Sequence, residues 1–413
     1  MKRILTRAVA PLAIVGLAVA LAGCTDAGSG EEATGPLTVW VMGDSGANFE
    51  QLVAPYTESS GQEVEVVAIP WDSIDEKLTT AVASGQGPDL IQVGLSKLRT
   101  FADAGALLEL NDEIADHPGL DPANFPAGVT SSVGDAQVSV PWVADTRVLF
   151  YRSDILAEAG IDAPPATWEE LRDDAKVLAG RGEGQYGYYI PQWDSPLPLE
   201  MTWSFGGQVV DGDGNIDFDT PEFNEALDTY LGLYADGSVP VNGDFDQTQG
   251  FISGITPMLM SGPYLASGIS SSAPELDGKW NVTTIPSGGS GEATSLFAGS
   301  NMGVWFNTDQ KTASLDLLEY ISSKEAQLDW YSINGELPAL TAALQDQSLT
   351  SDPLVAVYTK QLESSNSLPL VSNWDGGTGA DLLAALNAIA LTGADRDSTM
   401  QAFFDATAGT PTN

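Results

Sequence analysis

The side chains of this chain that could do chemistry are mostly carboxylates and aromatic rings. Its 413 residues include 57 Asp and Glu, 10 Trp, 11 Tyr and 13 Phe, but one histidine and one cysteine. A nucleophile that needs a histidine base has only His117, which we expect to be a solvated residue of the turn 116–119. Zinc sites built from several His and Cys ligands are excluded. Carboxylates that accept hydroxyl hydrogen bonds, together with aromatic faces that pack on pyranose C–H surfaces, suit sugar recognition.

One acidic segment has the ligand spacing of an EF-hand calcium loop. Its oxygen-bearing residues are Asp211, Asp213, Asn215, Asp217, Asp219 and Glu222. The sixth position, however, holds Ile216 where such a loop needs glycine, and Pro221 opens a helix before the last ligand. We therefore expect a β-turn followed by a helix cap there, and neither a metal site nor a cofactor.

The charge balance limits the partners. With 16 Lys and Arg against the 57 acidic residues, the formal net charge is −41. Such a surface repels phosphate backbones, so nucleic-acid binding is excluded. A neutral or cationic small ligand remains compatible with this charge.

The N-terminus has the organisation of a secretory signal peptide. Lys2, Arg3 and Arg7 precede the apolar run 8–20, which is shorter than the roughly 20 residues that span a bilayer. The sequence Leu-Ala-Gly-Cys ending at Cys24 resembles the lipobox of bacterial lipoproteins, in which the cysteine is lipidated and becomes the new N-terminus. The resemblance implies a signal peptide over 1–23 and a lipid anchor at the outer face of the bacterial cytoplasmic membrane. An ordinary secreted protein with an incidental cysteine is the alternative.

Beyond a small-residue, acidic tether over 24–36, periodicity predicts strands alternating with helices. Apolar runs at 37–41, 64–68 and 89–93 predict strands, and Phe49, Leu52, Val53 and Tyr56 mark a helix face between the first two. This order predicts βαβ units and a largely parallel sheet. A capping box at 167–170 predicts a later helix start. The length allows two or three domains.

Four segments resemble the family 1 extracellular solute-binding proteins, the maltose/maltodextrin-binding-like receptors of ABC importers. They are 43–91, 140–171 (VPWVADTRVLFYRSDILAEAGIDAPPATWEEL), 251–268 (FISGITPMLMSGPYLASG) and 300–340. The resemblance implies a two-lobed α/β fold, each lobe a mixed, mostly parallel sheet flanked by helices, with a hinge that closes around the ligand. It places lobe 1 at 37–145 and 299–345, and lobe 2 at 146–298 and 346–413.

The resemblance also implies ligand contacts near the lobe crossing. Asp44 corresponds to a polar contact after the first strand, with a helix N-cap as the alternative. Trp71 is either a cleft wall or a packing staple. Asp145 is the acidic contact at the crossing, and Arg147 shares its strand face; the two either both contact sugar or pair with each other.

The remaining predicted contacts are aromatic and polar residues from later segments. Tyr264 stands where the family has a Trp that stacks on a sugar ring, so stacking is expected while the ring preference is open. Trp193 and Asp194 match an aromatic and acidic cleft segment. Trp374 lies in a turn-rich loop, which favours function over core packing. Ser300 and Asn301 are expected to offer a hydroxyl and an amide from the cleft edge.

These implications describe a monomeric, non-enzymatic, substrate-binding lipoprotein of an ABC importer. It would capture a neutral carbohydrate, a di- or oligosaccharide, and deliver it to the transporter's permease subunits. One alternative is a secreted glycoside hydrolase, which also needs carboxylates and aromatic subsites. Another keeps the fold but binds a peptide or a polyamine.

Overall fold

A computed structural model describes residues 34–43, 45–70, 73–126, 129–241, 246–288 and 293–412. Cys24, Asp44 and Trp71 lie outside the described residues, so the lipid anchor and two of the ligand contacts remain predictions.

The larger sheet has seven strands in the order β11-β6-β10-β3-β1-β2, with β12 paired to β10. Its strands are β1 (Leu37–Met42), β2 (Val64–Ile69), β3 (Leu90–Gly94), β6 (Val140–Thr146), β10 (Ser295–Val304), β11 (Leu337–Pro338) and β12 (Ser365–Asn366). The first three strands are parallel to one another, as the βαβ pattern predicts. β10 runs antiparallel to both β3 and β6. The sheet is therefore mixed.

The helices that accompany this sheet bury one apolar face each. They are α1 (Gly46–Ser60), α2 (Ile74–Ser84), α3 (Leu98–Asp103), α10 (Lys311–Ile321), α11 (Lys324–Asn334) and α12 (Thr341–Leu344). Two further helices follow, α13 (Gln347–Thr350) and α14 (Pro353–Leu362), and α14 contacts this sheet and also strands of the second, smaller sheet. In α1 the predicted face is confirmed, because Phe49, Leu52, Val53 and Tyr56 are all buried. Gly61 ends α1 in the left-handed conformation that glycine adopts most readily.

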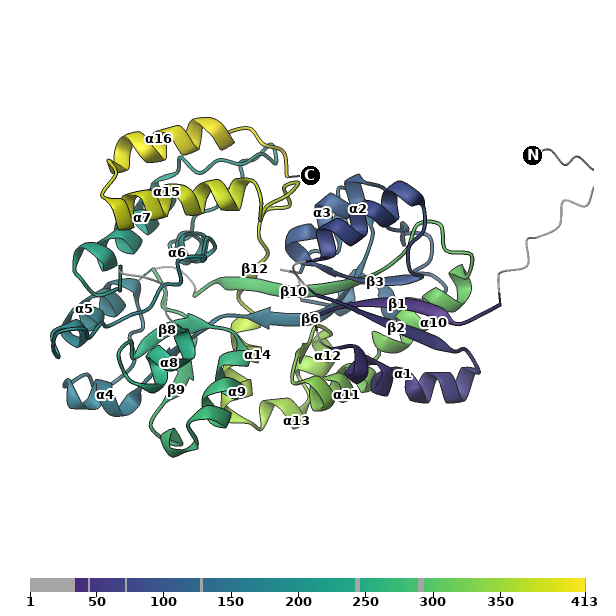
Figure 1. Cartoon of the computed structure of the whole chain (residues 1–413), viewed down its shortest axis with the longest axis horizontal. Coiled ribbons are helices and arrows are strands. Elements are labelled where there is room, and N and C mark those ends of the chain that lie inside the picture. The colour runs from purple at the N-terminus through teal and green to yellow at the C-terminus, as the bar shows by residue number, and fades with distance from the viewer. Residues whose placement is uncertain are drawn as a thin grey trace, which may run out of the picture. The chain divides into compact units, whose positions relative to one another are not determined.

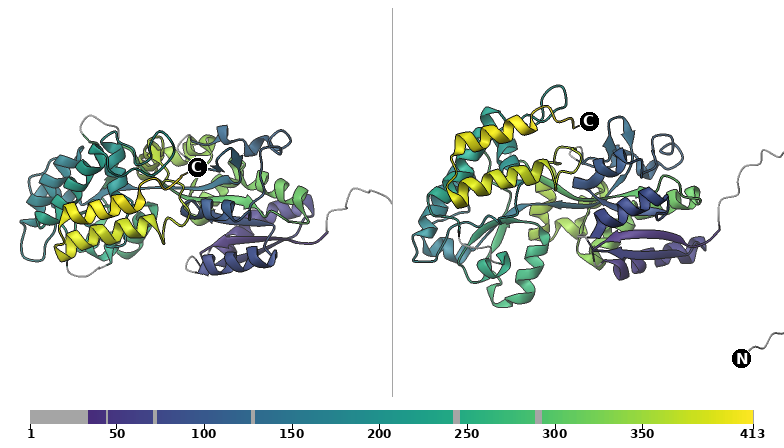
Figure 2. Two further views of the ribbon diagram at one scale, coloured as in Figure 1. Left: turned by 90° about the horizontal axis from the view of Figure 1, so that it is seen from above. Right: turned by 45° about the horizontal axis from the view of Figure 1, so that its top comes forward.

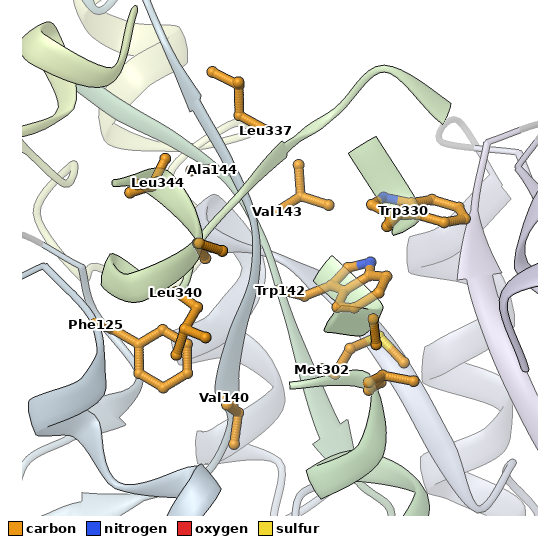
Figure 3. Close-up of a cluster of buried hydrophobic side chains, with 14 of the residues drawn as sticks. Phe125, Val140, Trp142, Val143, Ala144, Met302, Trp330, Leu337, Leu340 and Leu344 are labelled. Carbon is orange, nitrogen blue, oxygen red and sulfur yellow. The ribbon is translucent and has the colours of Figure 1, made fainter. Parts of the chain in front are cut away.

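Aromatic packing fills the core beneath this sheet. Trp142 of β6 lies 5.4 Å from Trp330 of α11, and Phe49 of α1 is 5.9 Å from each of them. Figure 3 shows Trp142 next to Trp330 and Met302, while Phe125 and Leu340 lie farther from the two tryptophans. Side chains from α1, α11 and β10 thus meet around Trp142 of β6. This packing holds β6 within the larger sheet.

A second, smaller sheet has the order β8-β7-β9. Its strands are β7 (Val148–Tyr151), β8 (Met258–Ser261) and β9 (Asn281–Thr283). Both pairings are antiparallel, so the prediction of a mostly parallel sheet is wrong here. Strand direction in this sheet depends on partners more than 100 residues apart in sequence, which local periodicity does not report. A separate hairpin joins β4 (Ser132–Val133) and β5 (Ala136–Gln137).

Helices surround the smaller sheet. They are α4 (Ser153–Glu158), α5 (Trp168–Ala179), α6 (Leu197–Ser204), α7 (Pro221–Ala235), α8 (Gln247–Ile252), α9 (Pro263–Ser272), α15 (Thr378–Thr392) and α16 (Arg396–Thr407). The predicted start of α5 is confirmed, because the Thr167 hydroxyl accepts a hydrogen bond from Glu170 N. Helices α15 and α16 pack side by side, and α15 also contacts α7 (Figure 2). Residues Ala33–Asn413, which include both sheets, form one compact unit.

Two strands, β6 and β10, run between the two groups of elements (Figure 1). The chain passes from β6 into β7 through the single residue Arg147. In β10, Gly299 has a φ of +116° opposite Ala144, and a Cβ there would lie 2.1 Å from Val143 O. The register with β6 shifts at the next step, between Ser300 and Asn301. The junction between the two sheets therefore combines a one-residue crossing with an irregular strand that requires glycine.

Candidate ligand-binding site

Arg147, the residue at the crossing, pairs with two buried carboxylates. Its Nη1 donates to both oxygens of Asp194 at 2.8 Å and to Glu200 Oε2 at 3.3 Å. These two acids hold the pKa of Arg147 above its usual value, although burial acts in the opposite direction. Asp194 and Glu200 belong to the segment that leads into and through α6, so this ion pair fixes that segment against the crossing.

Glu200 ties the same segment to β10. Its Oε1 accepts hydrogen bonds from Ser295 Oγ at 3.0 Å and from Leu296 N at 2.9 Å. Burial raises the pKa of Glu200 to about 7, while Arg147 lowers it. The sequence analysis missed this residue. The available signal was a carboxylate within the apolar run of α6, all eight residues of which are buried, because a charge in such a place needs a partner.

Asp145 lies near Arg147 but differs from Asp194 in what it bonds. Its Oδ1 is buried and has no hydrogen-bond partner among the described residues. Burial raises the pKa of Asp145 to about 6; Arg147 lowers it, and Glu336 raises it further. Of the two predicted arrangements, the hydrogen-bonded Asp145–Arg147 pair is not formed, since Nη1 of Arg147 is directed to Asp194 and Glu200.

Two aromatic rings, Trp193 and Tyr264, are exposed beside these charges. Trp193 is 56% exposed and Tyr264 is 55% exposed. Trp193 directly precedes Asp194, and Tyr264 is close enough to Arg147 to influence its pKa. Gln247 Nε2 donates to the Tyr264 hydroxyl at 2.9 Å. The structure thus brings five of the predicted residues into one region, with two ring faces open to solvent.

Position 262 connects Asp145 to Tyr264. A Cβ at Gly262 would lie 2.8 and 3.2 Å from the two Asp145 carboxylate oxygens and 3.2 Å from Tyr264 Cδ1. The backbone of the Gly-Pro-Tyr turn therefore touches the carboxylate on one side and the ring on the other.

A polar cluster near α1 and α11 was also missed. Asn48 Nδ2 donates to Asn334 Oδ1 at 2.6 Å, and Asn334 Nδ2 donates to Glu336 Oε2 at 2.7 Å. Trp330 Nε1 donates to the same Glu336 oxygen at 2.9 Å. Burial raises the pKa of Glu336, and its charge acts on Asp145 across the junction. Nothing in the spacing of these residues indicates that a helix start and a helix end meet there.

Ser300 and Asn301 are buried in the sheet rather than placed at the cleft edge as predicted, although Asn301 Oδ1 has no hydrogen-bond partner among the described residues. The Ser300 hydroxyl accepts a hydrogen bond from Gln92 Nε2 at 2.7 Å. Asn301 Nδ2 donates to Thr130 O at 2.8 Å and to Ser139 Oγ at 2.9 Å. Both side chains are buried inside the mixed sheet, where they hold neighbouring strands together. We therefore correct their assignment from ligand contacts to structural residues.

Trp374 is a core residue rather than an exposed aromatic. It is 2% exposed and packs in the core around α5–α7 and α15, where a Cβ at Gly379 would lie 2.5 Å from Trp374 Nε1. The prediction from its turn-rich context is wrong because the first turn of α15, with Gly379 against the ring, helps to enclose it.

The loop that carries Trp374 contacts both parts of the molecule. Leu370 packs against the core around α2 and α3, while Val371 and Trp374 belong to the other core. Asp375 Oδ2 accepts a hydrogen bond from Ser96 Oγ at 2.9 Å and lies 3.4 Å from Lys97 Nζ. This loop is a further tie between the two groups of elements.

The acidic segment forms the predicted turn and cap. Asp211 Oδ1 accepts hydrogen bonds from the backbone N–H groups of Asp213 and Asn215, and the Thr220 side chain caps α7. Within the described ranges, no group of three or more His, Cys, Asp or Glu is placed to hold a metal ion. No helix in that same part of the chain has the length and apolarity needed to cross a bilayer.

Residues 40–328 match the family model described as bacterial extracellular solute-binding protein. Because this match spans well over half of the 413 residues, the chain belongs to that family. The class is one of binding proteins rather than enzymes.

Individual relatives and solved structures agree with this assignment. The sugar-binding protein MalE of Xanthomonas citri is 27% identical, with a TM-score of 0.84 over 90% of this chain and 96% of its own. The diacetylchitobiose-binding protein DasA of Streptomyces coelicolor is 25% identical over 89% of each chain. An uncharacterized lipoprotein of Streptomyces antibioticus is 27% identical over 82% of this chain and 78% of its own. The predicted periplasmic-binding-protein-like α/β fold is confirmed.

Proposed function

We propose that this protein is the substrate-binding lipoprotein of an ABC importer and that it captures a di- or oligosaccharide. The observation that carries the proposal is the pair of exposed rings, Trp193 and Tyr264, beside a buried group of carboxylates and Arg147. Exposed aromatic faces supply apolar area for the C–H surface of a sugar ring, and adjacent carboxylates accept its hydroxyl hydrogen bonds. The sugar-binding names of MalE and DasA, two similar proteins, support the same ligand class.

The Arg147–Asp194 pair has a positioning role in this proposal. Because both Asp194 oxygens are held at 2.8 Å, the backbone that carries Trp193 is fixed before a ligand arrives. A preorganised ring loses less conformational freedom on binding than a mobile one, which favours affinity.

The domain and membrane assignments belong to the same proposal. We assign 37–145 with 299–345 to lobe 1, 146–298 with 346–413 to lobe 2, and the crossings at Arg147 and in β10 to the hinge. Cleavage after residue 23, lipidation of Cys24 and a tether over 24–36 would hold a monomer at the outer face of the cytoplasmic membrane. There it would deliver its ligand to the permease subunits. The similar lipoprotein of Streptomyces antibioticus supports the anchor.

Calorimetric titration of the purified protein with neutral mono- and oligosaccharides tests the ligand class. Amino acids and polyamines serve as control ligands, and chromatography of the recovered sugar tests for hydrolysis. We expect at least one sugar to bind and to be recovered intact. Trp193→Ala and Tyr264→Ala should each weaken binding at least tenfold, about 1.4 kcal/mol.

Phe306→Ala is the matched control, since this ring is also exposed but lies at the far end of β10. It should leave the affinity unchanged. Binding of a polyamine or peptide with no sugar binding would overturn the ligand class, and release of shorter sugars would make the protein an enzyme.

A further inference from the structure

The strongest unexplained group in the molecule is the Asp145 carboxylate. Its Oδ1 is buried without a hydrogen-bond partner among the described residues, although the Arg147 guanidinium and the Glu336 carboxyl are close enough to influence its pKa. The guanidinium of Arg147 is shared between Asp194 and Glu200 by short contacts. The acids of this junction therefore outnumber the cation that pairs with them.

The position of Asp145 directs it toward the ligand-facing ring. Gly262 lies against both of its oxygens and against Tyr264, whose ring is more than half exposed. Tyr358 of α14 contributes a second unpaired buried atom, its hydroxyl oxygen, and both Asp145 and Tyr264 influence its pKa. A substituent of a sugar ring stacked on Tyr264 would thus lie near one carboxylate oxygen, Oδ1, that has no donor among the described residues.

We infer that the sugar unit bound at Tyr264 carries a protonated amine, which Asp145 holds. This inference rests on the proposed sugar-binding function and specifies its substrate class as an amino sugar. A neutral hydroxyl would give Asp145 a hydrogen bond but leave the surplus of negative charge. An ammonium group supplies both the donor and the missing charge, and charge-assisted hydrogen bonds are stronger than neutral ones. The face of the Tyr264 ring attracts the same cation.

Protonation of Asp145 should abolish the preference for the amine. Four charged or titratable groups face Asp145 or influence it from the packed elements: Arg147, Glu336, Tyr264 and Tyr358. Burial raises the pKa of Asp145 to about 6, so the carboxylate is ionised at pH 7.5 and loses its charge below pH 6.

The test is calorimetric titration at pH 7.5 with matched sugars. The probes are glucose and cellobiose, their 2-amino-2-deoxy and 6-amino-6-deoxy forms, and the neutral N-acetylated counterparts. We expect an aminated probe to bind at least about tenfold more tightly than its neutral counterpart, and this ratio to shrink at pH 5. Asp145→Asn should bring the ratio of the two affinities close to one, whatever its effect on the affinity for the neutral sugar.

Two further variants keep the result interpretable. Gly262→Ala, at a backbone φ of −83° that alanine tolerates, should displace the carboxylate and reduce the ratio without removing a charge. Asp174→Asn is the matched control: burial and two neighbouring acids also raise the pKa of Asp174 to about 6, but it lies on α5 away from Tyr264. Equal affinity for aminated and neutral sugars, or a preference that survives Asp145→Asn, overturns the inference. Failure of every sugar to bind overturns the proposed function itself.

Discussion

The carboxyl groups around the β6–β7 crossing fall into two pairs with opposite surroundings. Asp194 and Glu200 are buried against Arg147, and Glu200 also accepts two hydrogen bonds from β10. Asp145 is buried with one oxygen unpaired, and Glu336 accepts only from neutral donors, Asn334 and Trp330. The first pair uses its charge inside the protein, whereas Asp145 of the second pair keeps one oxygen without a donor close to Tyr264.

This contrast separates structural charge from charge that is available to a ligand. Removing the partner of a buried ion pair leaves an uncompensated charge, which is strongly destabilising. Removing a charge that has no partner carries no such penalty and relieves the cost of burying it. Stability measurements can therefore distinguish the two pairs without knowledge of the ligand.

The largest expected effect comes from Arg147→Met. This change leaves Asp194 and Glu200 buried without a cation and should lower the free energy of unfolding by about 3–5 kcal/mol, measured by denaturant titration at pH 7.5. Lys324→Met is the control, because the Lys324–Asp346 pair at 2.6 Å is partly exposed to solvent and should contribute far less to stability. If Arg147→Met lost no more stability than the control, the ion pairs of Arg147 with Asp194 and Glu200 would not be a main stabilising contact of the fold.

The next effect is a dependence on pH. The folded-state pKa values of Asp145, about 6, and Glu200, about 7, lie above their usual values, so the folded protein binds more protons than the unfolded chain between pH 4 and 7. Stability contributed by these groups is complete below the unfolded pKa values and is lost as the pH rises through the folded ones. The protein should be roughly 4 kcal/mol less stable at pH 7.5 than at pH 5, since one pKa unit corresponds to about 1.4 kcal/mol.

The pKa of partly exposed Asp174 is raised as well, so this residue also makes the protein less stable at pH 7.5 than at pH 5. Denaturant titrations of the protein and of Asp145→Asn and Asp174→Asn at both pH values separate these contributions. A free energy of unfolding that rises from pH 5 to pH 7.5 would contradict the assignment of raised pKa values to this junction.

A smaller effect of opposite sign is expected for Asp145→Asn at pH 7.5. Because Oδ1 has no donor to lose among the described residues and a buried charge is removed, the free energy of unfolding should rise by about 1 kcal/mol. Asp194→Asn is the matched comparison and should be destabilising, since it gives up two contacts with Arg147. If Asp145→Asn destabilised the protein as much as Asp194→Asn, the distinction between the two pairs would fail.

The smallest expected change in stability belongs to Trp193→Ala. The ring is more than half exposed, so its removal should alter the free energy of unfolding by no more than about 0.5 kcal/mol. Thermal unfolding without ligand checks this value. A substantial loss would mean that the Trp193 ring, and not only the Asp194 carboxylate, stabilises this segment.

Local patterns in the sequence predict the elements but not their long-range partners. The face of α1, the start of α5 and the parallel strands β1–β3 follow from periodicity and capping, which act within a few residues. The antiparallel pairing of β7 depends on β8 and β9, which lie more than 100 residues away. No local spacing contains that information.

The predicted site residues show the same limit of local sequence patterns. Trp193 and Tyr264, which the resemblance proposed as ligand contacts, are exposed, whereas Trp374, proposed from its turn-rich context, is buried because α15 covers it. Ser300 and Asn301 are occupied by Gln92 and Ser139, partners that come from other strands. Glu200 and Glu336 gain their roles only where separate segments meet at the crossing.

Gly299 determines how much variation the crossing tolerates. Any side chain at this position would adopt an unfavourable backbone conformation and collide with Val143 O, so it would have to separate β10 from β6. In a library that samples every amino acid at each position, 299 should therefore accept a single residue type, whereas Gly262 should admit alanine in the folded state. Selections for new ligand preferences in this scaffold can vary exposed positions such as Trp193 but must leave residue 299 and the Arg147 ion pairs unchanged.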